Sequence, residues 1–210
     1  MGEYEDRKDY ASGALDGAGT SMQNLLETWL GEARQSDPDD YNAMTLSTVD
    51  QNGHPDARIV LLRDVDREGT GFLFYTNYRS VKGRQLTANP AAALTFFWPS
   101  LERQLRVRGQ VEPLTPEESD RYFHSRPRPS RVGAWASQQS EEIEDRAALG
   151  SAREGVEAQF PDDVPRPDHW GGYRLVADVV EFWQGRPGRL HDRIRHARHG
   201  DGWTKVRLQP

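Results

Sequence analysis

Two strand-like runs joined by an Asn-Gly turn constrain the fold of this chain most. AMTLSTV at residues 43–49 and ARIVLLR at residues 57–63 flank Asn52 and Gly53, which readily take the left-handed conformations of a tight hairpin turn. The segments that follow are too short for repeated parallel crossover units. The sequence therefore predicts a mainly β fold, an antiparallel barrel of about seven strands with peripheral helices. The five other expected strands cover residues 71–77, 91–98, 103–114, 173–183 and 202–208.

Capping residues predict where the peripheral helices begin. Ser21 precedes an amphipathic stretch that ends near residue 34. Residues 115–118 form a capping box with proline at the first helical position. Ser80 caps a short helix to residue 89, whose first backbone N–H groups and Lys82 are expected to face one small region suited to an anion.

The remaining segments are less regular. Residues 124–135, HSRPRPSRVGAW, are expected to form a loop rich in Arg and Pro. Residues 140–160 are expected to form an acidic helix, capped by Gln139 and Ser140. Residues 1–20 are polar and read as a mobile arm, which leaves residues 21–210 as a single domain.

Composition excludes several classes of protein. The chain has no cysteine, which rules out disulfides, thiolate catalysis and cysteine metal sites. No apolar run approaches membrane length and the N-terminus is too charged for a signal peptide, so a cytoplasmic protein without membrane contact is expected. A net charge of -6 argues against nucleic-acid binding, although residues 186–198 are locally basic. No metal site is predicted, because the histidine pair at 196 and 199 lacks further ligands and is expected to be solvent-exposed.

Arginine provides 24 of the 27 basic residues. The planar guanidinium binds phosphate and carboxylate through two parallel hydrogen bonds, so several arginines are candidates for ligand binding. A GC-rich genome would produce the same bias, and composition alone does not separate the two explanations.

The segment 181–193, EFWQGRPGRLHDR, concentrates candidate chemistry. An apolar strand ends at Trp183, a turn follows, and Arg189, His191 and Arg193 then alternate with other residues. If this run is extended, all three side chains share one face, which suits an anionic ligand with a proton-transfer step nearby. A solvated strand end with long basic side chains would have the same sequence.

The chain resembles the pyridoxine/pyridoxamine 5'-phosphate oxidase family from about residue 43 to residue 210. The blocks that carry the resemblance are RIVLLR, FYTNYRSVKG, LERQLRVRG, YFHSRPRPSRVGAWASQQS, WGGYRL and EFWQGRPGRLHDR, in that order. The resemblance implies a split β-barrel that binds FMN at the interface of a homodimer. It also implies oxidation of pyridoxine or pyridoxamine 5'-phosphate to pyridoxal 5'-phosphate, with O2 reduced to H2O2.

The resemblance assigns a role to each matching residue. Arg189 and His191 match catalytic residues over the reactive face of the flavin that also touch the substrate. Tyr122, Arg126 and Ser130 match the cradle for the substrate phosphate, and their spacing of four can converge on one phosphate if the helix continues or turns back there. Arg63 matches a position that touches both flavin and substrate. The positions that match other FMN contacts are Arg58, Ile59, Tyr75, Thr76, Lys82, Gln104, Gln139, Ser140, Trp183 and Arg193.

Several residues depart from the family pattern. Arg63 stands where lysine is usual, Val81 where arginine is common, and Arg131 where glutamine is usual. Arg7 and Tyr10 resemble an arginine and a tyrosine that fold over the substrate in some members. Two alternatives to the oxidase therefore stay open: a related flavin oxidase with a phenazine-type substrate, and a non-catalytic module that binds FMN or pyridoxal phosphate.

Overall fold

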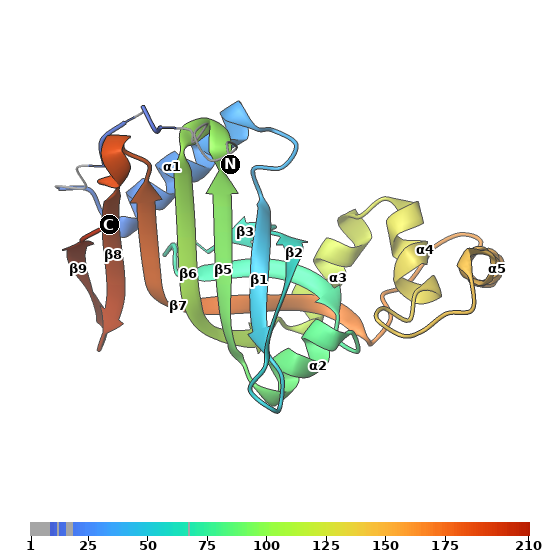
Figure 1. Ribbon diagram of the computed structural model, residues 1–210. Coiled ribbons are helices and arrows are strands. Elements are labelled where there is room, and N and C mark those ends of the chain that lie inside the picture. The colour runs from blue at the N-terminus through green and yellow to red at the C-terminus, as the bar shows by residue number, and fades with distance from the viewer. Residues whose placement is uncertain (1–8, 12, 16–18, 67) are drawn as a thin grey trace, which may run out of the picture.

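A strongly curled antiparallel sheet dominates the computed structural model, which describes residues 9–11, 13–15, 19–66 and 68–210 (Figure 1). The strand order is β2-β1-β5-β6-β7-β4-β3, and β8 adds to β7 and β9 to β8. This architecture confirms the predicted mainly β, antiparallel barrel with peripheral helices. The strands are β1 (Ala43–Val49), β2 (Pro55–Leu61), β3 (Asp64–Val65), β4 (Gly71–Asn77), β5 (Ala91–Trp98), β6 (Arg103–Pro113), β7 (Trp170–Gln184), β8 (Asp192–His199) and β9 (Gly202–Leu208).

The long strand β7 splits the barrel. One of its edges pairs with β6 along nearly its whole length, whereas the other edge pairs first with β4 and then with β8. A register shift between Arg108 and Gly109 interrupts the β6–β7 ladder, and both strands bend so that their two halves run in different directions (Figure 1). A Cβ on Gly109 would lie 1.9 Å from the Val176 carbonyl oxygen, so this close approach of two strands requires glycine.

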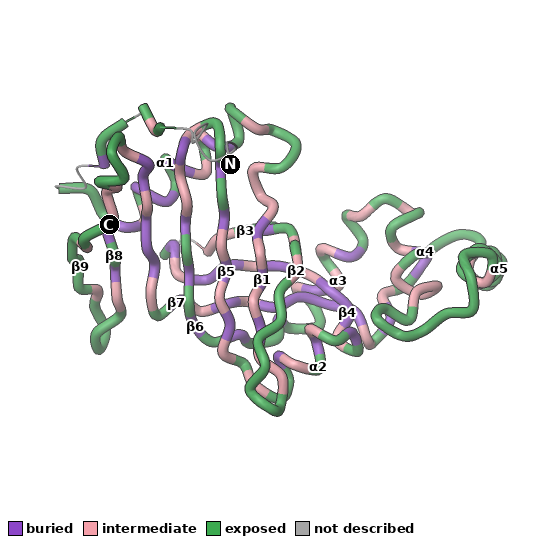
Figure 2. The backbone as a smooth tube through the Cα atoms, in the orientation of Figure 1, coloured by how far each residue is buried: buried purple, intermediate pink, exposed green. Residues whose placement is uncertain are grey.

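One face of the sheet forms the core and the other is open. The core face carries buried residues such as Phe96, Trp98 and Phe182, and Figure 2 shows buried residues at intervals along β5 to β7. Helix α1 (Met22–Ser36) covers this face, and its Trp29 packs edge-on against Phe182 with the ring centroids 5.1 Å apart. As predicted, Ser21 caps α1 by accepting a hydrogen bond from the Asn24 backbone.

Four further helices lie at the periphery. Helices α2 (Val81–Ala88) and α3 (Pro116–Ser125) begin at the predicted caps Ser80 and Thr115. The prediction of a loop for residues 124–135 was wrong, because residues 128–136 form helix α4 (Arg128–Ala136). Pro129 lies in its first turn, where its missing N–H costs no helical hydrogen bond.

Helix α5 (Arg146–Gln159) begins later than predicted. Asp145 is its N-cap and accepts a hydrogen bond from the Ala148 backbone, so neither Gln139 nor Ser140 caps it. No residue of α5 is fully buried, and the helix lies with α4 to one side of the sheet (Figures 1 and 2). Among the described helices, none is long and apolar enough to cross a membrane.

The C-terminal hairpin also differs from the prediction. Residues 192–199 form strand β8, which the sequence pattern missed because charged side chains alternate with only two buried ones. His196 is one of these two and is only 4% exposed, so the expectation of a solvent-exposed histidine was wrong at this position. Its ring packs edge-on against Phe182, and its Nε2 atom has no hydrogen-bond partner.

Candidate active site

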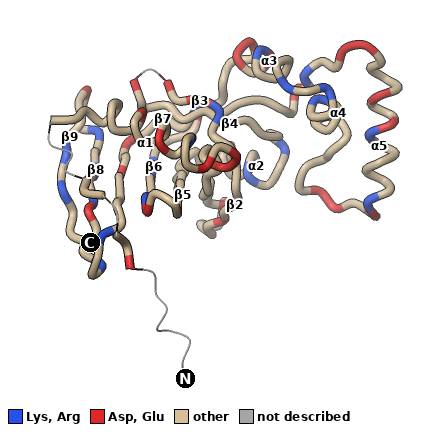
Figure 3. Tube along the Cα trace, turned by 90° about the horizontal axis from the view of Figure 1, so that it is seen from above, with Lys and Arg blue, Asp and Glu red and all other residues tan. Residues whose placement is uncertain are grey.

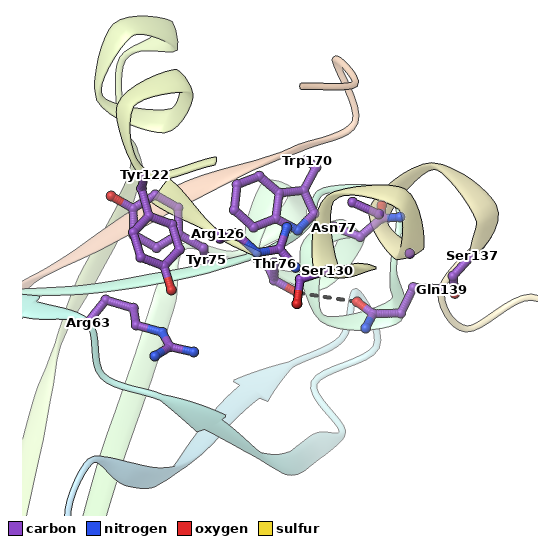
Figure 4. Close-up of a pocket in the computed structure, with 12 residues that line it drawn as sticks. Arg63, Tyr75, Thr76, Asn77, Tyr122, Arg126, Ser130, Ser137, Gln139 and Trp170 are labelled. Carbon is purple, nitrogen blue, oxygen red and sulfur yellow. Dashed lines mark hydrogen bonds between the residues drawn. The ribbon is translucent and has the colours of Figure 1, made fainter. Parts of the chain in front are cut away.

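A cavity of about 390 Å³ lies between β4, α3 and α4 (Figure 4). Aromatic rings form one wall, because Tyr75 stacks on Tyr122 with the centroids 3.9 Å apart and on Trp170 at 5.6 Å. The walls thus combine flat rings with polar and cationic groups, as expected for a planar anionic ligand. The residues that line it are Arg63, Tyr75, Thr76, Asn77, Tyr122, Arg126, Ser130, Gly133, Ala134, Ser137, Gln139 and Trp170.

The path of the chain between α3 and α4 brings the predicted phosphate cradle together. Helix α3 ends at Ser125, Arg126 is its C-cap in extended conformation, and α4 starts two residues later. The chain therefore turns back after Tyr122, and Tyr122, Arg126 and Ser130 line the same cavity. This turn-back is one of the two arrangements in which the spacing of four was expected to bring the three side chains together.

Arg126 is the most distinctive cation of the cavity. Its guanidinium carbon lies 4.5 Å from the centre of the Trp170 ring and 5.6 Å from that of Phe123. Its Nη1 atom is buried without a hydrogen-bond partner. Burial lowers the pKa of Arg126 and the nearby Arg63 guanidinium lowers it further, while Tyr122 opposes the shift.

Arg63 adds a second cation to this cavity. Its guanidinium carbon lies 5.7 Å from the centre of the Tyr122 ring, and the side chain faces the cavity in Figure 4. In the described part of the chain, neither Arg63 nor Arg126 forms an ion pair with a carboxylate. Two unpaired guanidinium groups beside hydroxyl groups create a site for an anion with several oxygen atoms.

Hydrogen bonds gather a second group of predicted residues at the N-terminus of α2. Gln139 Oε1 accepts from Lys82 Nζ at 3.0 Å and from Thr76 Oγ1 at 3.3 Å. Ser140 Oγ accepts from the Val81 backbone N–H at 3.2 Å. Burial, and secondarily the charge of Arg58, lowers the pKa of Lys82. The predicted convergence of Lys82 and the helix N-terminus on one region is confirmed, and residues 139 and 140 close that region.

Ser140 takes a positive φ of 76°, a backbone conformation that costs energy for residues other than glycine. Such a conformation persists only where the surrounding structure enforces it. This backbone conformation places Ser140 beside the first residue of α2 and not at the start of α5. Arg189, another predicted site residue, has a φ of 62°.

A network that the sequence did not reveal fixes Arg58 on β2. Its guanidinium donates to Thr48 Oγ1 at 2.6 Å and to Asp56 Oδ2 at 2.6 Å. Gln85 on α2 accepts from Arg58 at 3.2 Å and donates to Asp56. Gln85 lies one helical turn after Lys82, on the same face of α2. This spacing was the one sequence signal that could have identified Gln85 as part of the site.

A third group lies at the other end of β7. Gln104, Trp183 and Arg193 stand opposite one another on β6, β7 and β8, so their side chains share one face of the sheet. The outward-facing Ile59, 64% exposed, belongs to the same open face. Strands β8 and β9 both carry basic residues (Figure 3). Arg193 Nε donates to Glu181 Oε1 at 2.9 Å.

The condition of an extended run, which would place Arg189, His191 and Arg193 on one face, is not met at Arg189 and His191. Residues 187–189 form a short 3-10 helix and the strand begins only at Asp192, so Arg189 and His191 are not part of an extended run. Tyr10 packs edge-on against both Trp183 and His191, with the ring centroids 5.6 Å away in each case. Arg7, the other predicted residue of the arm, lies outside the described residues.

The cavity and this turn lie far apart in one chain. Trp170 borders the cavity and Trp183 contacts His191, and these two residues stand near opposite ends of β7. Thirteen positions of strand correspond to roughly 40 Å along the chain, although the bend shortens the direct distance. Neither Arg189 nor His191 lines the cavity.

Comparison with known proteins places this arrangement in a family. A sequence model of the family described as "Pyridoxamine 5'-phosphate oxidase" matches residues 32–160, and one described as "Pyridoxine 5'-phosphate oxidase C-terminal dimerisation region" matches residues 170–210. The chain belongs to the pyridoxamine 5'-phosphate oxidase family.

Curated relatives from this family match almost the whole chain. A pyridoxine/pyridoxamine 5'-phosphate oxidase from Ralstonia pickettii is 53% identical over 207 residues, and one from Thermosynechococcus vestitus is 51% identical, each with 97% of both chains covered. Among solved structures, PhzG from Burkholderia lata, in complex with tetrahydrophenazine-1-carboxylic acid, has a TM-score of 0.83 at 33% identity. That match covers 89% of this chain and 91% of PhzG. An FMN-binding protein from Nostoc punctiforme is 17% identical, with a TM-score of 0.74, and therefore shares the fold. That match covers 91% of this chain and 99% of the Nostoc chain.

The structure shows the surroundings of the three departures from the oxidase family pattern. Arg63 lines the cavity beside Tyr122. Val81 is partly exposed at the first position of α2, next to Ser140. Arg131 donates to Asp163 Oδ1 at 2.6 Å, so its guanidinium already has an anionic partner outside the cavity.

Proposed function

We propose that this chain is an FMN-dependent oxidase that converts pyridoxine or pyridoxamine 5'-phosphate to pyridoxal 5'-phosphate, with O2 reduced to H2O2. The observation that carries the proposal is the unpaired, buried Nη1 of Arg126 in a cavity it shares with Arg63, Tyr122 and Ser130. A phosphate monoester supplies the oxygen atoms and the negative charge that these groups lack. The stacked rings of Tyr75, Tyr122 and Trp170 suit a flat pyridine ring beside it.

The donor groups around α2 fit FMN. Lys82 and the preorganised Arg58 can hold the cofactor phosphate, with Gln139 and Ser140 beside the N-terminus of α2. Gln104, Trp183 and Arg193 lie on the open sheet face near the other end of β7, so the copies of these residues in a partner chain can hold the ring system. When bound, FMN supplies the hydride acceptor and the route for electrons to O2.

We further propose a homodimer with FMN at its interface. The open face of the sheet carries exposed apolar side chains, among them Ile59 and Phe97, which is 53% exposed. Continuous cross-strand pairing joins this face to the C-terminal hairpin, within the region that the second family model describes as a dimerisation region. A second copy of the chain would cover these side chains and remove their apolar surface from water.

A dimer would also complete the site. Arg189 and His191 lie too far from the cavity of their own chain to touch a substrate there, but a partner chain packed on the open face can bring its own pair to it. In this arrangement the cavity binds the phosphate, and the partner's loop holds the pyridine ring and its oxygen substituents. The cytoplasm remains the predicted location.

The similarity to PhzG supports a second candidate, an oxidase that acts on a phenazine-type carboxylic acid. Arg126 could pair with a carboxylate as well as with a phosphate. However, the same cavity also contains a second cation, Arg63, and the hydroxyl groups of Tyr122 and Ser130. These hydrogen-bond donors are more numerous than the two oxygen atoms of one carboxylate require.

Oxygen consumption by the purified protein tests the proposal. The flavin released on denaturation is identified first, and oxygen uptake and H2O2 are then measured with pyridoxine 5'-phosphate and pyridoxamine 5'-phosphate. The unphosphorylated vitamers serve as matched controls, and tetrahydrophenazine-1-carboxylic acid tests the alternative. We expect FMN, with H2O2 formed only from the phosphorylated vitamers. A flavin-loaded protein that consumes no oxygen with either would rule out the proposal.

A further inference from the structure

The main-chain N–H of Arg186 donates a hydrogen bond to Nδ1 of His191 at 3.1 Å. A backbone amide can only donate, so Nδ1 must carry its lone pair toward Arg186. A neutral imidazole has one protonated nitrogen, and the proton is therefore on Nε2. This bond determines which ring nitrogen of His191 can donate and which cannot.

Two aromatic contacts help to keep the ring in this orientation. Trp183 lies against the His191 ring with the centroids 4.6 Å apart, and Tyr10 packs edge-on against it. The Arg186 side chain donates to the Gly13 carbonyl, and its Nε lies 3.6 Å from Asp192 Oδ2. The Arg186 side chain thus contacts both the segment before α1 and the first residue of β8, which holds residue 186 beside His191.

The other ring nitrogen is available to a ligand. Within the described residues, Nε2 of His191 forms no hydrogen bond, and the ring is only partly buried. A protonated nitrogen that projects from a fixed ring is a directional hydrogen-bond donor. Arg189, two residues earlier in the same turn, adds a positive charge to this surface.

We propose that Arg186 is a positioning residue whose backbone N–H fixes His191 as the Nε2–H tautomer, so that His191 donates a hydrogen bond to the substrate and does not act as its proton acceptor. The identity of the acceptor rests on the proposed function: it is an oxygen substituent on the pyridine ring. The tautomer itself does not depend on that function.

Nitrogen NMR of the purified, flavin-loaded protein with 15N-labelled histidine tests the tautomer. Each tautomer has a characteristic pair of ring-nitrogen shifts, and the His191 signals are assigned by their loss in the His191→Gln variant. At a pH where the imidazole is neutral, we expect a protonated Nε2 and an unprotonated Nδ1. A protonated Nδ1 overturns the inference, whatever the substrate of the protein.

A pair of isosteric variants tests the role in catalysis. Gln in His191→Gln can place an N–H donor near the position of Nε2, whereas Glu in His191→Glu places only an acceptor there. With pyridoxine 5'-phosphate we expect kcat/KM of the Gln variant to exceed that of the Glu variant by about tenfold or more, the equivalent of one good hydrogen bond. Equal rates, or a faster Glu variant, contradict the donor role. Absence of turnover in the unsubstituted protein instead refutes the proposed function and leaves the NMR result to decide the tautomer.

Discussion

Replacing Arg126 by alanine should weaken substrate use without loss of flavin. The guanidinium lines the cavity, stacks on Trp170 and leaves Nη1 buried without a partner, so no ion pair within the described chain is broken by its removal. If Arg126 holds the substrate phosphate as proposed, what is lost is a charge-assisted contact worth roughly 1.5–3 kcal/mol. This free energy corresponds to a fall in kcat/KM of about 10- to 150-fold, expected mainly as a higher KM.

Steady-state oxygen uptake with pyridoxine 5'-phosphate measures this effect, and flavin absorbance of the purified variant measures cofactor content. Arg128→Ala is a matched control, because the Arg128 guanidinium donates to the carbonyl groups of Phe160 and Asp162 and does not line the cavity. The control should lose stability and keep its KM. Loss of FMN from Arg126→Ala, or an unchanged KM, would show that the phosphate cradle has been assigned to the wrong residues.

Three further predictions concern stability and the cofactor region. Burial, assisted by the charge of Lys205, lowers the pKa of His196 from 6.5 to about 4. The unfolded chain therefore binds the proton first as the pH falls from 6.5 toward 4. His196 should contribute about 2 kcal/mol less stability at pH 5 than at pH 7.5 in chemical denaturation, and His196→Leu should remove this contribution. Gly109→Ala should prevent proper folding, seen as insoluble protein or a large drop in Tm, whereas Gly150→Ala on exposed α5 should raise stability by a few tenths of a kcal/mol. Ser80→Ala removes the acceptor for the Gly83 N–H and Lys82 Nζ, so it should cost about 1 kcal/mol in thermal unfolding and weaken FMN binding measured by fluorescence titration.

Local signals predicted much of the fold. Strands β4, β5 and β9 begin and end at the predicted residues, because each has a short apolar or β-branched run between clear turn residues. The caps Ser21 and Ser80 were also predicted correctly, since a capping side chain bonds to backbone only three residues away.

The predicted elements were wrong where contacts between distant residues or an unusual backbone conformation determine the structure. Strand β8 exists because it pairs with β7 and β9, a long-range effect that its own charged sequence does not reveal. Two prolines suggested a loop at α4, although Pro129 is compatible with a first helical turn. The positive φ of Ser140 is incompatible with a helix at that residue, and α5 begins only after its N-cap, Asp145.

The candidate site was predicted in part for the same reason. Family motifs identified residues that the structure gathers in the cavity and around α2. Their supporting partners, such as Gln85 beside Arg58 and the backbone of Arg186 beside His191, belong to no motif and became visible only from the hydrogen bonds. Sequence spacing also could not reveal that the cavity and the turn with Arg189 and His191 lie apart in one chain.

Complementation between two impaired variants tests the composite site most directly. Arg126→Ala damages the cavity and Arg189→Ala damages the loop, so both sites of each homodimer should be slow when the substrate concentration is far below the KM of Arg126→Ala. A heterodimer purified through two different tags regains one intact site, formed by the cavity of one chain and the loop of the other. We predict about half of the unsubstituted rate of pyridoxine 5'-phosphate oxidation per heterodimer. A heterodimer no more active than the mean of the two homodimers would contradict the account, because it would place Arg126 and Arg189 in the same chain's site.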